Sequence, residues 1–221
     1  MKKVVIHPDY AFCADFIDRL PDIFHTEGET IFKARNELKI FEQHGLELAV
    51  KSFKTPHFIN KVAYSVLRAS KAERSYQYAS KLLDKGIPTP KPVAYIEIKK
   101  YGRLFNSFLV SLKSRFRREI RELIHSPDMP EAYPVLRDFV QFTADIHQKG
   151  VFHKDYSPGN ILFGKTGDRY EFELVDLNRM QFREVDLKAG CKSFDKLCLR
   201  DDLHKFALQQ YHGVRNDKGD G

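Results

Sequence analysis

The 221-residue sequence contains no tryptophan and only three cysteines, Cys13, Cys191 and Cys198. Their number is odd and none forms a Cys-x-x-Cys pair, which argues against a disulfide framework and against a cysteine-based zinc site. This usage is typical of a reducing compartment. Free cysteine is among the most buried residue types, so we expect Cys191 and Cys198 to be small core residues.

Long apolar runs are also absent. No stretch approaches the roughly 18 apolar residues that a membrane-spanning helix needs. The first apolar run, Val4-Val5-Ile6, ends after three residues and is too short for the apolar part of a secretory signal. A content of 42% hydrophobic and 30% charged residues indicates a globular chain. We therefore expect a cytoplasmic protein.

Acidic residues are fewer than basic ones, and the formal net charge is +7. Such an excess favours anionic partners, namely nucleotide phosphates, nucleic acid or an anionic membrane surface, although a solvated basic face is the alternative. Basic residues are dense in residues 113–121, at the start of an expected helix over residues 115–124 that could lie peripherally on acidic headgroups. The sequence has no recognisable nucleic-acid-binding module, so that partner is not expected.

The most informative stretch runs from His153 to Asn160 and continues into the apolar run Ile161-Leu162-Phe163. It reads H-x-D-x-x-x-x-N, the layout of a phosphotransferase catalytic loop. A Pro-Gly bend within it can bring Asp155, as acceptor of a hydroxyl proton, close to Asn160, as ligand of a phosphate-bound metal. A strand over residues 172–175 then delivers Asp176 as a second ligand, and hard oxygen ligands suit Mg²⁺.

Two histidines, His147 and His153, lie in or next to this stretch. His153 is expected to have a structural role, hydrogen-bonding near Asp176, and His147 to be a satisfied histidine at a helix end. Zinc ligation by the pair is the alternative, but no further ligand has suitable spacing.

A candidate nucleotide lysine lies upstream. Three strands in a meander are expected over residues 31–34, 37–41 and 46–53, with turns at Arg35-Asn36 and at Gln43-His44-Gly45. Lys51 near the end of the third strand, ahead of a helix, resembles the lysine of a kinase small lobe that pairs nucleotide phosphates. The first turn carries no G-x-G-x-x-G, so a glycine-rich phosphate loop is not expected.

The helix that follows is expected over residues 58–85. Glu73 is the only acidic residue within residues 57–83, and it is therefore the one helical carboxylate that can hold Lys51. The alternative is a solvated surface carboxylate. No basic residue lies three or four positions away to make it a same-helix ion pair.

The remaining pattern completes two lobes. The N-terminal lobe, residues 1–112, holds Lys51 and Glu73, and residues 1–28 show no clear period. The C-terminal lobe, residues 113–221, holds the catalytic loop 153–160, Asp176 and a short helical tail. The other expected elements are a hairpin over residues 93–98 and 103–112, a helix with apolar positions from Leu136 to Ile146 and a C-cap at Gly150, and a helical stretch over residues 186–208.

The pattern I-H-x-x-G-V-x-H-K-D-x-S-P-G-N-I-L-F, followed by V-D-L-N-R-M from Val175, resembles the kinase-like superfamily. It is most similar to the bacterial lipopolysaccharide-kinase branch, the Kdo and heptose kinases, as are the stretches Ser70–Tyr76 and Gly86–Glu97. The likeness covers about residues 30–200. It implies an α+β, two-lobed protein-kinase-like fold, with a β-meander small lobe and a shortened, mainly helical large lobe.

The resemblance also implies ATP-dependent phosphorylation of a sugar hydroxyl, Kdo or heptose, in the lipopolysaccharide inner core at the cytoplasmic membrane face. At the positions that match the motifs of this family, the resemblance implies that Asp155 is catalytic and that Asn160 and Asp176 bind the metal. It likewise implies that Lys51, with Glu73, binds ATP. Asn178 replaces the Gly of D-F-G, Ser157 replaces the Lys of Ser/Thr protein kinases, and no A-P-E follows. These departures favour a glycan acceptor. A compact atypical protein kinase and a non-catalytic nucleotide-binding pseudokinase are the alternatives.

Overall fold

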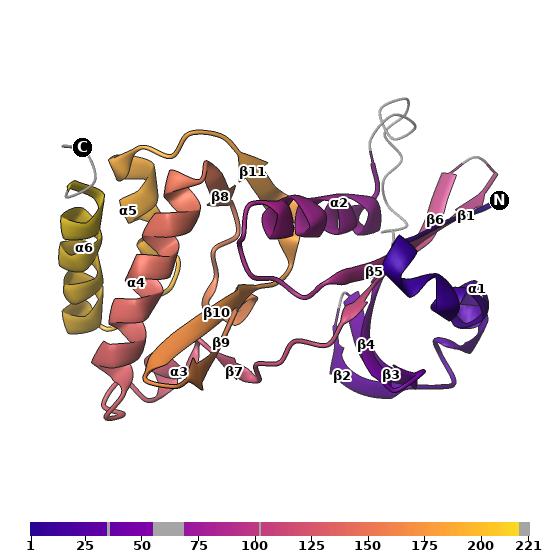
Figure 1. Ribbon diagram of the computed structural model, residues 1–221, viewed down its shortest axis with the longest axis horizontal. Helices are drawn as coiled ribbons and strands as arrows, with labels where there is room; N and C mark the ends of the chain where they lie inside the picture. The colour runs from indigo at the N-terminus through magenta and orange to yellow at the C-terminus, as the bar shows by residue number, and fades with distance from the viewer. Residues whose placement is uncertain (35, 55–68, 102, 217–221) are drawn as a thin grey trace. The chain divides into compact units, whose positions relative to one another are not determined.

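Figure 1 shows the computed structural model, which describes residues 1–34, 36–54, 69–101 and 103–216. The chain divides into two compact units, which are described separately. Met1–Asp84 and Pro90–Lys113 form the first unit, and Lys85–Thr89 and Ser114–Gly221 form the second. The composition of both units, antiparallel strands with helices, confirms the expected α+β class.

The first unit is built on a six-stranded antiparallel sheet in the order β1-β5-β6-β4-β3-β2. Five of its strands match expected ones, and β1 was not expected. The turn between β3 and β4 places His44 and Gly45 at positive φ, as the predicted tight turn requires. The strands are β1 (Lys2–Ile6), β2 (Glu29–Lys33), β3 (Asn36–Gln43), β4 (Leu46–Lys54), β5 (Pro92–Lys100) and β6 (Arg103–Leu112).

Both faces of this sheet carry helices. Helix α1 (Ala14–Ile23) packs Phe16, Ile17 and Leu20 against one face, and the 3-10 helix before it (η1, Pro8–Cys13) adds Cys13. The other face carries a smaller cluster, in which Ala72 of α2 contacts residues of β4 and β5. Sequence reasoning missed α1, although its buried residues have the spacing of one helix face.

Helix α2 (Lys71–Asp84) begins later than expected. Ser70 is its N-cap residue, because its Oγ accepts a hydrogen bond from the backbone N–H of Glu73 at 3.0 Å. The spacing Ser-x-x-Glu is a capping signature that could have predicted this start. The part of the expected helix before Ala69 lies outside the described residues.

The second unit has α4 (Ala132–Gln148) as its central helix, and six apolar side chains of α4 are wholly buried. A three-stranded sheet in the order β10-β9-β7 and a two-stranded sheet of β11 and β8 accompany it. The remaining elements are β7 (Arg118–Glu119), α3 (Glu122–His125), β8 (Val151–His153), η2 (Pro158–Asn160), β9 (Ile161–Thr166), β10 (Arg169–Leu174), η3 (Leu177–Arg179), β11 (Met180–Phe182), α5 (Leu187–Asp195) and α6 (Asp201–Asn216).

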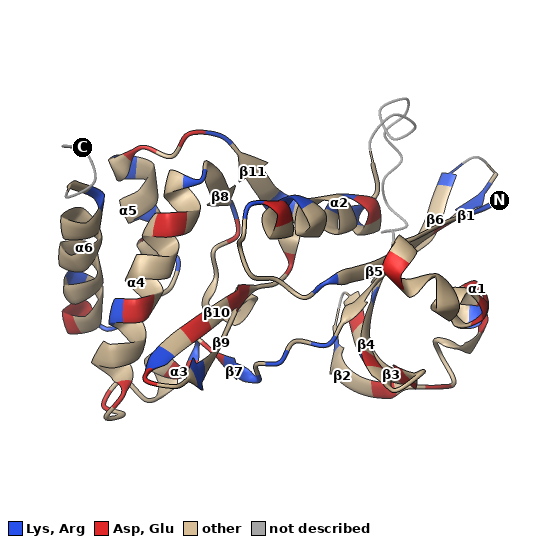
Figure 2. Ribbon diagram, in the orientation of Figure 1, with Lys and Arg blue, Asp and Glu red and all other residues tan. Residues whose placement is uncertain are grey.

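One expectation for the second unit was wrong. The expected basic helix over residues 115–124 is instead strand β7 followed by the short helix α3, because Arg118 and Glu119 pair with β9. Figure 2 marks these basic positions on the chain leading into β7 and acidic positions along β10. The expected helical stretch over residues 186–208 is present, and it consists of two helices, α5 and α6, of which α6 continues to Asn216.

The three cysteines are all free. Cys13 is buried in the first unit, and Cys191 is half-buried with its Sγ 3.5 Å from Nε2 of His212. Cys198 is exposed, at a positive φ of 51°, so the expectation of a core residue was wrong there. Within the described part of the chain, no helix combines the length and the apolar character that crossing a bilayer requires.

Candidate active site

The segment that leads to the bend of residues 153–160 begins where α4 ends. Gly150 has a φ of 70° and reverses the chain after α4, as a glycine following a helix commonly does. Strand β8 then runs antiparallel to β11, with His153 opposite Met180. This pairing brings the segment that precedes Asp155 alongside the segment that follows Asp176.

His153 connects these two segments through its ring. Nδ1 accepts a hydrogen bond from the backbone N–H of Asp155 at 3.1 Å, and Nε2 lies 3.2 Å from the carbonyl oxygen of Val175. Burial lowers the pKa of His153, so the ring is neutral. Because Nδ1 is an acceptor, the ring proton is on Nε2 and is donated to Val175. The predicted structural role of His153 is confirmed.

The bend itself is held by three hydrogen bonds. The N–H of Ser157 donates to the carbonyl of Asp155 at 2.8 Å, and the N–H of Asn160 donates to the carbonyl of Ser157 at 2.9 Å. The side-chain Nδ2 of Asn160 also donates to the carbonyl of Asp155, at 3.0 Å. Since Nδ2 is used internally, the Oδ1 of Asn160 is the atom that can serve as a metal ligand.

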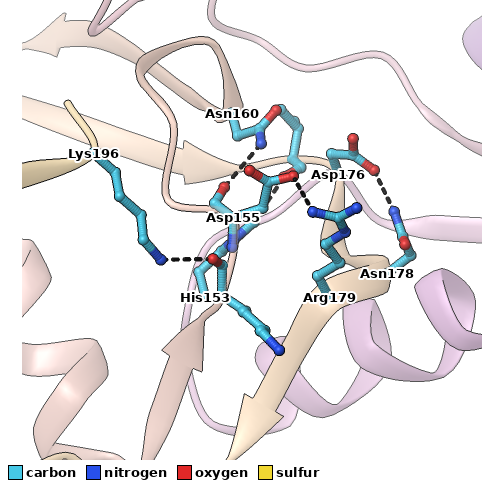
Figure 3. Close-up of polar contacts among 9 residues, drawn as sticks. His153, Asp155, Asn160, Asp176, Asn178, Arg179 and Lys196 are labelled. Atoms are coloured by element: carbon cyan, nitrogen blue, oxygen red, sulfur yellow. Dashed lines mark hydrogen bonds and ion pairs between the residues drawn. The ribbon is translucent and has the colours of Figure 1, made fainter. Parts of the chain in front are cut away.

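Asp176 is held next to this bend (Figure 3). The N–H of Val175 donates to the carbonyl of Asn160 at 2.9 Å, which connects the two chain segments. Asp176 has a left-handed backbone with φ 55°, and its Oδ1 accepts from Nδ2 of Asn178 at 2.6 Å. The residue that replaces the kinase glycine therefore orients the carboxylate of Asp176, a role that sequence reasoning missed.

Two basic side chains contact the bend, and neither was foreseen. Arg179 Nη1 lies 3.5 Å from Oδ2 of Asp155, with both side chains largely exposed. Lys196 Nζ donates to the carbonyl of Lys154 at 2.7 Å. Figure 3 shows Arg179 directed at the carboxylate of Asp155 and Lys196 directed at the backbone carbonyl of the preceding residue. They add positive charge where a phosphoryl group would need it.

Tyr156 anchors the bend to α4. Its ring is 1% exposed and stacks on Phe139, with the ring centroids 5.8 Å apart. Thr143 Oγ1 donates to the carbonyl of Phe139 and lies 2.8 Å from the hydroxyl of Tyr156. Because a hydroxyl has one proton, Tyr156 donates in this pair. The position of Asp155 is thus fixed by packing of the adjacent residue.

His147 is a satisfied core histidine, as predicted. It is 2% exposed, and its Nδ1 lies 2.8 Å from the hydroxyl of Tyr211 on α6. Burial, followed by the charges of Arg215 and Arg183, lowers its pKa from 6.5 to about 3. The ring is therefore neutral, and its Nδ1 is occupied by the hydroxyl of Tyr211.

Lys51 and Glu73 belong to the first unit. Lys51 lies on β4, and its Nζ is 5.4 Å from the ring centroid of Phe53. Glu73 lies in the first turn of α2, where its Oε1 accepts from Lys3 Nζ at 3.0 Å and from the hydroxyl of Tyr95 at 3.1 Å. Sequence reasoning missed Lys3 and Tyr95, and the pairing of Glu73 with Lys51 stays a prediction.

The donor set around the bend fits Mg²⁺. Asn160 Oδ1 is a hard amide oxygen, and Asp176 supplies a carboxylate. Within the residues that the structure describes, no cluster of three or more His, Cys, Asp or Glu side chains could hold a metal on its own. Mg²⁺ is commonly bound by one or two protein oxygens, with phosphate oxygens and water completing its shell. Asn160 and Asp176 together could supply such a partial set of ligands.

Comparison with known proteins agrees with this geometry. A sequence profile of the "Lipopolysaccharide kinase (Kdo/WaaP) family" matches residues 26–215. A solved structure, "WaaP in complex with acyl carrier protein", is similar over 99% of this chain and 92% of that chain, with a TM-score of 0.63 and 18% identity. This similarity shows a shared kinase-like fold. Because the profile covers most of its length, the chain belongs to the lipopolysaccharide kinase (Kdo/WaaP) family.

Proposed function

We propose that this protein transfers the γ-phosphoryl group of Mg-ATP to a sugar hydroxyl of a glycolipid, Kdo or heptose of the lipopolysaccharide inner core. The family is one of lipopolysaccharide kinases. The observation that carries the proposal is the set of bonds joining His153, Asp155, Asn160 and Val175. These bonds keep a base and two oxygen ligands in one compact group.

The reaction needs positioning and charge neutralisation more than covalent chemistry from the protein. The acceptor hydroxyl oxygen forms a bond to the γ-phosphorus, the bond from that phosphorus to the β,γ-bridging oxygen breaks, and ADP leaves. Asp155 receives the hydroxyl proton, a contribution of about 10²–10⁴ in rate. Asn160 and Asp176 would hold Mg²⁺, which when bound neutralises charge on the β- and γ-phosphates. Lys51, steadied by Glu73, would neutralise further phosphate charge.

Because a glycolipid acceptor lies in a membrane, the reaction would take place at the cytoplasmic face of an anionic membrane. Segment 113–121 is the proposed peripheral contact with that surface. Most of the cations in this segment have acidic partners: Lys113 pairs with Glu47, Arg115 with Glu171 and Glu173, Arg118 with Glu122 and Glu131, and Arg121 with Glu119.

WaaP was solved in complex with acyl carrier protein. An acyl carrier protein is therefore a candidate protein partner here, which co-elution of the two purified proteins would test.

The experiment is phosphate transfer from Mg-ATP to three acceptors: Kdo-lipid, heptose-containing core lipid and a generic peptide mixture. Mass spectrometry of the products identifies the phosphorylated group. A phosphorylated sugar supports the proposal. Phosphorylation of peptide alone would favour the protein-kinase alternative. Absence both of turnover and of a thermal shift with Mg-ATP would favour the non-catalytic one, since ligand at about 100 times Kd should add roughly 2.7 kcal/mol.

A further inference from the structure

Glu73 is held by two residues that lie far from it in the sequence. Its Oε1 accepts from Lys3 Nζ on β1 at 3.0 Å and from the hydroxyl of Tyr95 on β5 at 3.1 Å. Lys3 Nζ also lies 5.1 Å from the ring centroid of Tyr95. All three residues belong to the first unit, so this one carboxylate oxygen links α2 to β1 and β5 in addition to the apolar packing of Ala72 and Tyr76.

The contact is partly shielded from water. The side chain of Glu73 is 17% exposed and that of Lys3 is 42% exposed. Burial favours the neutral carboxyl, but hydrogen bonds from Lys3 and Tyr95 outweigh it, and the pKa of Glu73 is lowered. The pKa of Lys3 is raised through its contacts with Tyr95 and Glu73. Both groups are therefore charged at neutral pH.

The sheet register places Lys51 on the same face as this contact. Tyr95 on β5 and Lys51 on β4 both lie opposite Leu109 on β6. Residues directly opposite one another in a sheet point to the same face, so the three form a row across adjacent strands. Two strand spacings, about 9.5 Å, separate the Cα atoms at the ends of this row. A carboxylate held over Tyr95 is within reach of a long side chain from Lys51.

We propose that Lys3 and Tyr95 are positioning residues for nucleotide binding. Both bind Oε1 of Glu73, and they thereby hold its second oxygen, Oε2, where it can receive the ammonium of Lys51. This rests on the proposed function, in which Lys51 serves the phosphates of ATP. Lys3 acts through Glu73 and touches no substrate.

Lys2 provides a matched control on the same strand. It carries the same charge one residue away, but it points to the opposite face of the sheet, where its Nζ lies 2.6 Å from Oδ1 of Asp18 on α1. Its register partner, Ile98, packs against the core on that side. Loss of Lys2 therefore changes the net charge equally without affecting Glu73.

The first experiment measures steady-state kinetics with Mg-ATP. Lys3→Met should raise the KM for ATP about tenfold, the loss of one charge-assisted hydrogen bond, with a smaller change in kcat. The KM for the acceptor should not change. Lys3→Arg should recover most of the wild-type KM, and Lys2→Met should match the wild type. An unchanged KM for ATP in Lys3→Met would overturn the proposal. A lower KM would also overturn it, because it would show that Lys3 competes with Lys51 for Glu73.

The second experiment needs no nucleotide and no activity. A double-mutant cycle of Lys3→Met and Glu73→Gln on unfolding in urea tests the contact, and the two changes should be clearly non-additive. Additive effects would overturn the inference. A wild-type protein that turns over no acceptor would instead count against the proposed function, and the cycle would still report on the contact.

Discussion

At the scale of single residues, the two aspartates of the site differ in what holds them. The side chain of Asp155 is 43% exposed and faces Arg179, whereas Asp176 accepts a short hydrogen bond from Asn178. The backbone carbonyl of Asp155 carries the bond from Asn160, and this bond survives any side-chain change. Asp155 can therefore be altered without disturbing the ligand set.

Asp155→Asn should lower kcat by about 10²–10⁴ while leaving the Kd of Mg-ATP close to that of the wild type, because the base acts after the nucleotide is bound. Asp176→Asn should instead weaken Mg-ATP binding, since a metal ligand is lost. Turnover assays and calorimetric titration with Mg-ATP separate the two effects. Equal nucleotide affinity in the wild type and Asp176→Asn would contradict the metal role.

His147 makes stability depend on pH with a definite sign. The pKa of His147 is about 3 in the folded protein, whereas the ordinary value, taken for the unfolded chain, is 6.5. Between pH 3 and pH 6.5 the unfolded chain therefore binds more protons than the folded protein. The free energy of unfolding should therefore fall as the pH drops from 6.5, by up to about 1.4 kcal/mol per pH unit from this residue.

His147→Gln should remove that part of the pH dependence, because glutamine does not titrate and can still bond Tyr211. The measurement is urea unfolding at several pH values from 4 to 7. His25→Gln, at an exposed position, is the control and should keep the wild-type slope. If His147→Gln also keeps the wild-type slope of unfolding free energy against pH, the neutral buried state of His147 is not the cause of that slope.

At the scale of secondary-structure elements, α5 and α6 meet at a glycine. A Cβ built on Gly190 would lie 2.0 Å from the hydroxyl oxygen of Tyr211 and 2.6 Å from its Cζ. That hydroxyl is already fixed by His147 and by Arg215, at 2.8 Å each. The ring cannot move aside without losing both bonds.

Gly190→Ala should therefore destabilise the protein by about 1–3 kcal/mol, as expected for overpacking. Gly213→Ala on α6 is the matched control, because nothing lies within 4 Å of a Cβ built there. Alanine is the better helix former, so this variant should be more stable by about 0.5–1 kcal/mol. Urea unfolding of both variants is the measurement. A Gly190→Ala protein as stable as Gly213→Ala would show that the α5–α6 contact adapts freely.

The same scale shows which elements sequence could predict. The strands β3 and β4 and the bend from His153 to Asn160 were predicted because turn chemistry and local spacing specify them. The helix expected over residues 115–124 was wrong because Arg118 and Glu119 pair with β9, a contact formed only in the folded chain. Helix α1 was missed for another reason: Pro21 lies inside it, and a proline within a short apolar pattern indicates the end of a helix.

At the scale of the whole molecule, sequence reasoning fails for contacts between residues that are far apart in the sequence. Glu73 and Lys3 are separated by 70 residues and meet through sheet order, which no local pattern encodes. Asn178 and Lys196 likewise acquire their roles only from the fold. Residues that belong to a motif, such as Asp155 and Asn160, could be selected as candidates from the sequence, whereas the residues that contact them could not.

Net charge is another property of the whole chain, and its effect depends on which cations are already paired. In segment 113–121, Arg118 Nε donates to Glu122 at 2.7 Å and its Nη2 lies 3.1 Å from Glu131. Arg117 is exposed and has no acidic partner among the residues that the structure describes. At about 0.1 M salt, charges more than roughly 10 Å apart are screened, so direct headgroup contact decides membrane binding.

If this segment meets the membrane, Arg117→Gln should weaken binding to vesicles of mixed phosphatidylcholine and phosphatidylglycerol about fivefold, because one basic residue near an anionic surface contributes about 1 kcal/mol. Arg118→Gln should change vesicle binding less, because its guanidinium already serves two carboxylates, and should instead lower stability by up to about 1 kcal/mol. Co-sedimentation at several salt concentrations and urea unfolding measure the two effects. Equal vesicle binding by the wild type and Arg117→Gln would move the search for a membrane contact away from residues 113–121.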